Sequence, residues 1–100
     1  MATAEYLDVD PRSLHLPTSR LSGADPVKLH LQTVKFGSST SGMPPILAYR
    51  GSDGRLMIYD GTTRATRVAR LLPGATVRVE VIRTLSRPVG HLPTIGDKIP

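Results

Sequence analysis

The segment from Ile58 to Leu72 constrains the fold of this chain more than any other part of its sequence. It begins as a short apolar strand that ends in Asp60-Gly61, and there it turns directly into a helix that carries arginines. The helix is indicated by apolar residues at i, i+3, i+4 and i+7, which form one stripe: Ala65, Val68, Ala69 and Leu72. Pro73-Gly74 then ends it. A strand joined to a helix by so short a turn predicts a domain in which the helix packs on a sheet.

The rest of the chain supplies partners for this strand and helix. Alternating apolar and polar residues predict strands over residues 5–9 and 77–81. Two short apolar runs, residues 46–50 and 56–60, flank the Ser52-Asp53-Gly54 turn and predict a hairpin. Asp25-Pro26 is typical of a helix start, and the apolar residues after it share one helix face: Val27, Leu31 and Val34. We therefore expect a small single-domain α/β (α+β) fold, a mixed sheet of about four strands with one or two packed helices.

The chain after residue 84 has no regular periodicity. Proline and glycine recur there and interrupt every helix or strand pattern: Pro88, Gly90, Pro93, Gly96 and Pro100. We therefore predict that residues 1–84 form the domain and that residues 85–100 form an irregular C-terminal tail. The loop over residues 37–42, rich in glycine and serine, is predicted to be a flexible connector or a cover for a ligand.

Composition narrows the classes of function. The chain has no cysteine, which excludes disulfides, thiolate catalysis and cysteine-ligated zinc. It shows neither an apolar run of membrane-spanning length nor a basic-then-apolar leader pattern, so we expect a soluble, cytoplasmic protein without a membrane partner. His15, His30 and His91 lie far apart and have no carboxylate at ligand spacing, so the sequence predicts no metal site.

Positive charge is concentrated in one part of the chain. The formal net charge is +5, from 13 lysines and arginines against 8 acidic residues. From residue 55 to residue 87 the acidic residues are Asp60 and Glu80 alone, whereas the arginines are Arg55, Arg64, Arg67, Arg70, Arg78, Arg83 and Arg87. Such a stretch attracts nucleotides or nucleic acid, although a solubilising surface explains the charge equally well. We predict weak nucleic-acid contact at Arg67 and Arg70, which lie off the apolar stripe and would otherwise simply be solvated.

The start of the helix after Gly61 is the best candidate for a binding site. A helix start has unpaired backbone N–H groups and the positive end of the helix dipole, which together favour a phosphate. Arg64 stands in the first turn, where its guanidinium could bind the same anion. Asp60 either caps the helix, and so competes with a phosphate, or holds a metal ion that bridges to it. Thr62 and Thr63 are either hydroxyl donors to the phosphate or ordinary capping residues.

The order of these parts resembles the ParB/sulfiredoxin superfamily, in particular its ParB-like N-terminal domain. The matching pieces are a glycine before a Pro-Ile strand entry, an Asp-Gly hairpin, an Asp-Gly-x-x-Arg turn into a helix, and an early Pro-to-Arg segment. The residues concerned are Gly42, Pro45, Ile46, Asp53, Gly54, Asp60, Gly61, Arg64, Ala65 and residues 17–20. The resemblance extends over most of the chain, and its most specific motif is the turn from Asp60 to Arg64. It implies a ParB/sulfiredoxin-like fold.

The resemblance also implies a ligand. Members of the superfamily bind the phosphates of a nucleotide at the equivalent turn, which would be formed here by Gly61, Thr62, Thr63 and Arg64. CTP or ATP is the implied nucleotide, and Mg²⁺ is a candidate metal. Thr62 stands where sulfiredoxins often have cysteine, chromosome-partitioning relatives glutamate and several enzymes histidine. Because threonine is neither a thiolate nor a base near neutral pH, sulfiredoxin chemistry is excluded if this alignment holds.

Three functions remain open at this point. The first hypothesis is a nucleotide- or phosphate-binding ParB-like module whose basic face contacts nucleic acid. The second is a small Mg²⁺-dependent enzyme (an NTPase, phosphotransferase or nuclease) whose carboxylate is Asp60, or Asp53 if the hairpin folds over the site. The third is a protein-interaction domain that has lost the ligand. The sequence specifies neither the nucleotide, nor the physiological partner, nor the oligomeric state.

Overall fold

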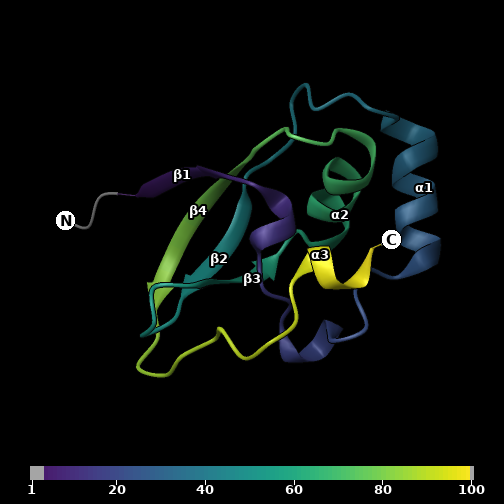
Figure 1. The fold of residues 1–100 in the computed structure, drawn as a ribbon. Helices are drawn as coiled ribbons and strands as arrows, with labels where there is room; N and C mark the ends of the chain where they lie inside the picture. The colour runs from purple at the N-terminus through teal and green to yellow at the C-terminus, as the bar shows by residue number, and fades with distance from the viewer. Residues whose placement is uncertain (1–3, 100) are drawn as a thin grey trace.

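A computed structural model describes residues 4–99 and has the mixed α/β architecture that the sequence predicts. In chain order the elements are β1 (Glu5–Val9), the 3-10 helices η1 (Pro11–Ser13) and η2 (Thr18–Arg20), α1 (Pro26–Phe36), β2 (Ile46–Arg50), β3 (Leu56–Asp60), α2 (Thr62–Leu71), β4 (Val77–Thr84) and α3 (Ile95–Lys98) (Figure 1). The bounds of β1, β2 and β3 are those that the sequence patterns predict. Among the described residues, no helix is long and apolar enough to cross a membrane.

The strands form one mixed sheet in the order β1-β4-β2-β3. β2 and β3 pair antiparallel, which confirms the predicted hairpin, and β1 pairs antiparallel with β4. β4 also pairs with β2, and this pairing is parallel, because the connection through β3 and α2 returns the chain to the direction of β2. β4, which follows the other three strands of the sheet in the sequence, therefore lies inside it with a neighbour on each side.

The helices lie to one side of the sheet, and the main core is formed where α2 meets it (Figure 1). The predicted apolar stripe of α2 is confirmed, since Ala65 and Val68 are fully buried and Ala69 is 2% exposed. Alternate strand residues and two leucines between η1 and η2 complete the core: Ile46, Ala48, Ile58, Val77, Val79, Leu14 and Leu16. Alternate residues of the strands thus form one face of the sheet, the apolar stripe forms one face of α2, and these two faces are buried against each other.

α1 lies at the edge of the molecule and packs on α2 (Figure 1). The predicted cap is confirmed, because the Asp25 carboxylate accepts a hydrogen bond from the backbone N–H of Val27 at 2.8 Å. The apolar face that the sequence predicts on α1 is turned to solvent, with Val27 67%, Leu31 61% and Val34 71% exposed. Leu29 is the buried residue of this helix.

The segment after β4 contributes to the core, so an irregular tail over residues 85–100 does not describe it. It runs beside the β2–β3 hairpin and then forms α3, whose start carries a capping box between Thr94 and Asp97 (Figure 1). Val89 and Ile95 are each 1% exposed. Single buried side chains between prolines and glycines leave no periodic pattern in a sequence, which is why this packing could not be predicted.

Asp53, in the turn of the hairpin, fastens this C-terminal segment to the sheet. Its carboxylate accepts hydrogen bonds from the backbone N–H groups of Gly90 at 2.8 Å and Val89 at 3.3 Å, and from that of Arg55 at 3.2 Å. Partial desolvation raises the pKa of this carboxyl, but the N–H groups of Gly90, Arg55 and Val89 favour its ionised form and together lower the pKa below its ordinary value. Ionised Asp53 therefore stabilises the folded state.

We expect the contribution of Asp53 to stability to depend on pH. A carboxyl with a lowered pKa in the folded state stabilises fully above the ordinary aspartate pKa of about 3.9, and this stability is lost as the pH falls toward the lowered value. Asp53→Asn should thus lower the urea midpoint near neutral pH, and the difference from wild type should shrink below about pH 3.9. Asp8→Asn is the matched control, because Asp8 is exposed and accepts no such amide hydrogen bonds. An Asp53→Asn difference that stays constant with pH would contradict this role.

Candidate phosphate-binding site

The N-terminal end of α2 has no side-chain cap. Gly61 occupies the N-cap position, and the first amide to bond back is that of Ala65, which donates to the Gly61 carbonyl at 2.9 Å. The backbone N–H groups of residues 62–64 therefore have no partner within the helix. Only glycine suits this turn: its φ is +111°, and a Cβ would lie 2.8 Å from the Ile46 side chain and 2.9 Å from an Arg64 nitrogen.

The Arg64 side chain is held by a hydrogen bond from one of its terminal nitrogens, and its buried Nε donor is unpaired among the described residues. Its Nη2 donates to the carbonyl of Pro45 at 3.1 Å, which anchors the guanidinium against the entry to β2. Its Nε is enclosed and has no hydrogen-bond partner among the described residues. A buried donor without an acceptor is costly. The sequence places Arg64 in the first turn of the helix, and the structure shows it fixed beside the free amides.

These groups line one cavity of about 320 Å³, which we call the phosphate cavity. Its walls come from three separate segments: residues 17–20, α1, and the β3–α2 turn. The lining residues are Pro17, Ser19, Arg20, Lys28, Gln32, Tyr59, Asp60, Gly61, Thr62, Thr63 and Arg64. The volume falls within the usual range for small-molecule sites. All four residues predicted to bind phosphate, Gly61 to Arg64, are therefore brought together.

Two positively charged side chains of the cavity were not predicted from the sequence pattern. Lys28 on α1 and Arg20 on η2 join Arg64, so three positive charges face one carboxylate, that of Asp60. Arg20 belongs to the early segment that the resemblance singles out. Lys28 and Gln32 stand at i and i+4 and so share one side of α1, a spacing that offers a sequence signal for both. The net charge of this lining favours an anion.

The expectation that Asp60 caps α2 is wrong. Gly61 takes the N-cap position in the left-handed conformation, and no side chain bonds to the first amides of the helix. The Asp60 carboxylate instead lies 3.8 Å from Arg64 Nη2, and its side chain is 64% exposed. The competition between Asp60 and a phosphate for the helix amides is therefore absent from this structure.

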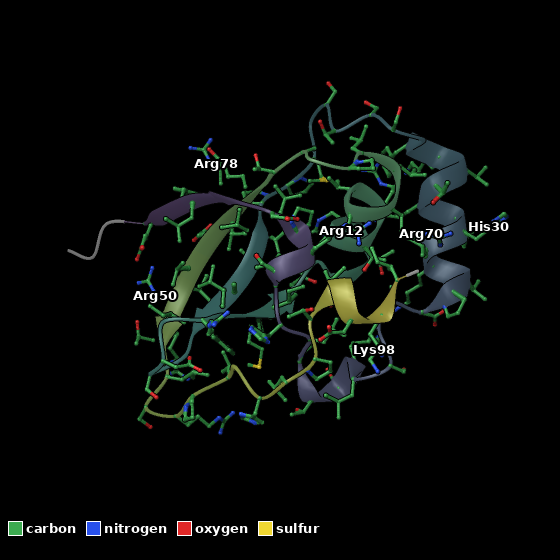
Figure 2. All side chains as sticks on the ribbon, in the orientation of Figure 1. Arg12, His30, Arg50, Arg70, Arg78 and Lys98 are labelled. Atoms are coloured by element: carbon green, nitrogen blue, oxygen red, sulfur yellow. The ribbon has the colours of Figure 1, made fainter. Side chains whose placement is uncertain are left out.

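The expectation that Arg67 is solvated is also wrong, because it is 2% exposed. Its Nη1 donates to the carbonyls of Gly37 and Ser39, both at 2.8 Å, and so binds the C-terminal end of α1 and the loop that follows. Arg67 is thus enclosed and not positioned for the predicted nucleic-acid contact. Arg70 is exposed one turn later on α2 (Figure 2) and does not line the phosphate cavity, so contact at Arg70 stays a prediction.

The remaining candidates lie outside the cavity. Asp53 binds the amides of residues 89–90, so the hairpin does not fold its carboxylate over the site. Among residues 4–99, no group of three or more His, Asp or Glu side chains is placed to hold a metal ion. The Gly37–Gly42 loop is bound by Arg67 at its start, as described above. Asp60 is therefore the carboxylate that the structure brings to this cavity.

Comparison with known proteins supports the fold. No family model matches the sequence, and no curated protein matches it. Among solved structures, the chain is similar to SbnI with C-terminal truncation from Staphylococcus aureus, at 23% sequence identity and a TM-score of 0.61. The match covers 77% of this chain and 30% of that one, so this chain spans about a third of its length. At this identity the similarity shows the fold alone, and the ParB/sulfiredoxin resemblance stays a prediction.

Proposed function

We propose that this chain binds a nucleotide through its phosphates at the N-terminal end of α2. The observation that carries the proposal is the convergence of Arg20, Lys28 and Arg64 on one cavity beside uncapped helix amides. Backbone N–H groups and the helix dipole favour phosphate oxygens, and arginine binds them through charge-assisted hydrogen bonds. The pre-positioned guanidinium of Arg64 means that little side-chain ordering is needed on binding.

The resemblance to the ParB/sulfiredoxin superfamily supports a nucleotide over free phosphate. It implies CTP or ATP as the ligand, with Mg²⁺ as a candidate companion ion. Thr62 is 9% exposed and lines the cavity. Thr63 is half-buried and lines the same cavity.

The proposal is tested by an NMR titration of isotope-labelled protein with CTP, ATP, GTP and inorganic triphosphate, each with and without Mg²⁺. We expect saturable shifts of the amide signals of residues 61–64, because these amides would donate to phosphate oxygens. Sodium chloride at matched ionic strength is the control for general screening. If no triphosphate shifts these amides, the phosphate site is ruled out.

One observation favours a catalytic version of this site. The Asp60 carboxylate lines the same cavity and is free of any capping role, so it is available to a Mg²⁺ ion on a bound phosphate. If the chain is an enzyme, hydrolysis or transfer should fail in Asp60→Asn while nucleotide binding persists. Incubating the titration samples and following phosphate release by phosphorus NMR measures this directly. Release that is equal in wild type and Asp60→Asn would exclude Asp60 as the catalytic residue.

A further inference from the structure

A second cavity of about 590 Å³ opens beside the phosphate cavity, and we call it the tyrosine groove. The two share Pro17, Ser19 and Tyr59 in their linings, so they are neighbours on one surface. One wall of the groove is the hairpin and the other is the segment that follows β4. The lining residues are Pro17, Thr18, Ser19, Tyr49, Met57, Ile58, Tyr59, Arg87, Pro88, Val89, His91 and Leu92.

Two aromatic rings line the groove on the side of the hairpin. The rings of Tyr49 and Tyr59, on the neighbouring strands β2 and β3, have centroids 5.2 Å apart and planes tilted by 40°. Tyr59 is 57% exposed, so its ring is open to a ligand and is not part of the core. The chain has only three tyrosines and one phenylalanine, and two of these four rings meet in this groove. Exposed tyrosine rings on a sheet are platforms on which nucleic-acid bases stack.

The charge of the groove points to the same class of ligand. Arg87 and His91 line it and are exposed, whereas none of its lining residues is acidic. Beyond Tyr59 the surface continues into the phosphate cavity, where Arg20, Lys28 and Arg64 lie. A cationic groove that passes over aromatic rings is the arrangement by which proteins follow a single strand without reading its sequence.

We propose that the tyrosine groove binds single-stranded nucleic acid, with bases stacked on Tyr59 and Tyr49 and backbone phosphates on Arg87. A single strand is favoured over a duplex because only unpaired bases can turn their faces onto exposed aromatic rings. The site goes beyond the proposed nucleotide site, although the two adjoin at Tyr59.

Fluorescence anisotropy with a labelled oligothymidylate of about ten nucleotides carrying a 5′-hydroxyl tests this site. We expect saturable binding that weakens between about 50 mM and about 200 mM NaCl. Tyr59→Leu should weaken binding by about fivefold or more, as loss of one stacked base implies. Tyr6→Leu is the matched control: Tyr6 is 45% exposed on β1, outside the groove, and that variant should bind as wild type does.

Arg87→Gln tests the phosphate contact separately. Its slope of log affinity against log salt should be shallower by about 0.7, the value for one single-strand phosphate. Arg78→Gln is the control, since Arg78 stands over the Tyr6 ring and does not line the groove.

The same assay separates this inference from the nucleotide site. Arg64→Ala should weaken triphosphate binding far more than binding of the 5′-hydroxyl strand, because Arg64 lines the phosphate cavity and not the groove. The proposal is overturned if the oligothymidylate does not bind, or if Tyr59→Leu binds it as wild type does. It is also overturned if polyglutamate competes as well as the strand, which would mark a general polyanion surface.

Discussion

Replacing Arg67 with methionine is expected to lower the free energy of unfolding by about 3 kcal/mol. The side chain is 2% exposed, and its Nη1 donates to the carbonyls of Gly37 and Ser39, both at 2.8 Å. Each hydrogen bond from a charged donor contributes about 1.5–3 kcal/mol, and two carbonyls lose their donor together. Urea unfolding, followed by circular dichroism, measures the change.

Two further variants make this test specific. Arg70→Met removes an exposed arginine from the next turn of α2, and it should change stability by no more than about 0.5 kcal/mol. Arg67→Lys should restore stability only in part, because one ammonium cannot replace Nη1 together with the Nε and Nη2 contacts to Gln32 and Met43. If Arg67→Met unfolds at the same urea concentration as wild type, the burial of Arg67 contributes nothing to the fold.

Replacing Arg64 with alanine is expected to weaken triphosphate binding by about 1.5–3 kcal/mol, a factor of about 10 to 150. The loss follows from the position of the guanidinium, which is anchored on the Pro45 carbonyl beside the free amides of α2. Isothermal titration calorimetry with inorganic triphosphate and with the tightest nucleotide measures it. Both ligands should lose affinity equally, because the contact is made to phosphate.

The controls for Arg64 address folding and general charge. Arg78→Ala removes an equal charge from a residue outside the phosphate cavity, and it should leave affinity unchanged. Arg64→Lys keeps the charge but lacks the planar, two-nitrogen fork of the guanidinium, so its affinity should lie between wild type and alanine. A urea midpoint for Arg64→Ala close to wild type shows that the fold survives. Unchanged triphosphate affinity in such a folded variant would remove Arg64 from the site.

Short sequence patterns were sufficient to predict the elements that depend only on residues close together in the sequence. The hairpin follows from two short apolar runs around an Asp-Gly turn, and the bounds of β2 and β3 are those predicted. The stripe on α2 is confirmed because helical spacing alone places those residues on one face. The same spacing failed for Arg67, which lies opposite the stripe but is covered by the chain around Gly37, 30 residues away. The spacing of residues along a helix does not indicate which segment, distant in the sequence, packs over them.

The candidate site likewise has one part that the local sequence predicts and another that depends on how distant segments pack. The turn from Gly61 to Arg64 was predictable because it combines a glycine with the start of a helix. Arg20 and Lys28 reach the phosphate cavity only because η2 and the start of α1 are folded back toward this turn. That placement depends on how α1 packs against α2, which no local spacing encodes. The cap predicted at Asp60 is wrong because the next residue, Gly61, takes the N-cap position of α2 in the left-handed conformation.

The interior position of β4 has a consequence for how the chain is made. β4 follows β1, β2 and β3 in the sequence, yet β1 and β2 both hydrogen-bond to it. Until it emerges, β1 has no neighbour and the hairpin presents an open β2 edge, the kind of edge that recruits other chains. Translation of residues 77–84 is therefore the step that closes the sheet.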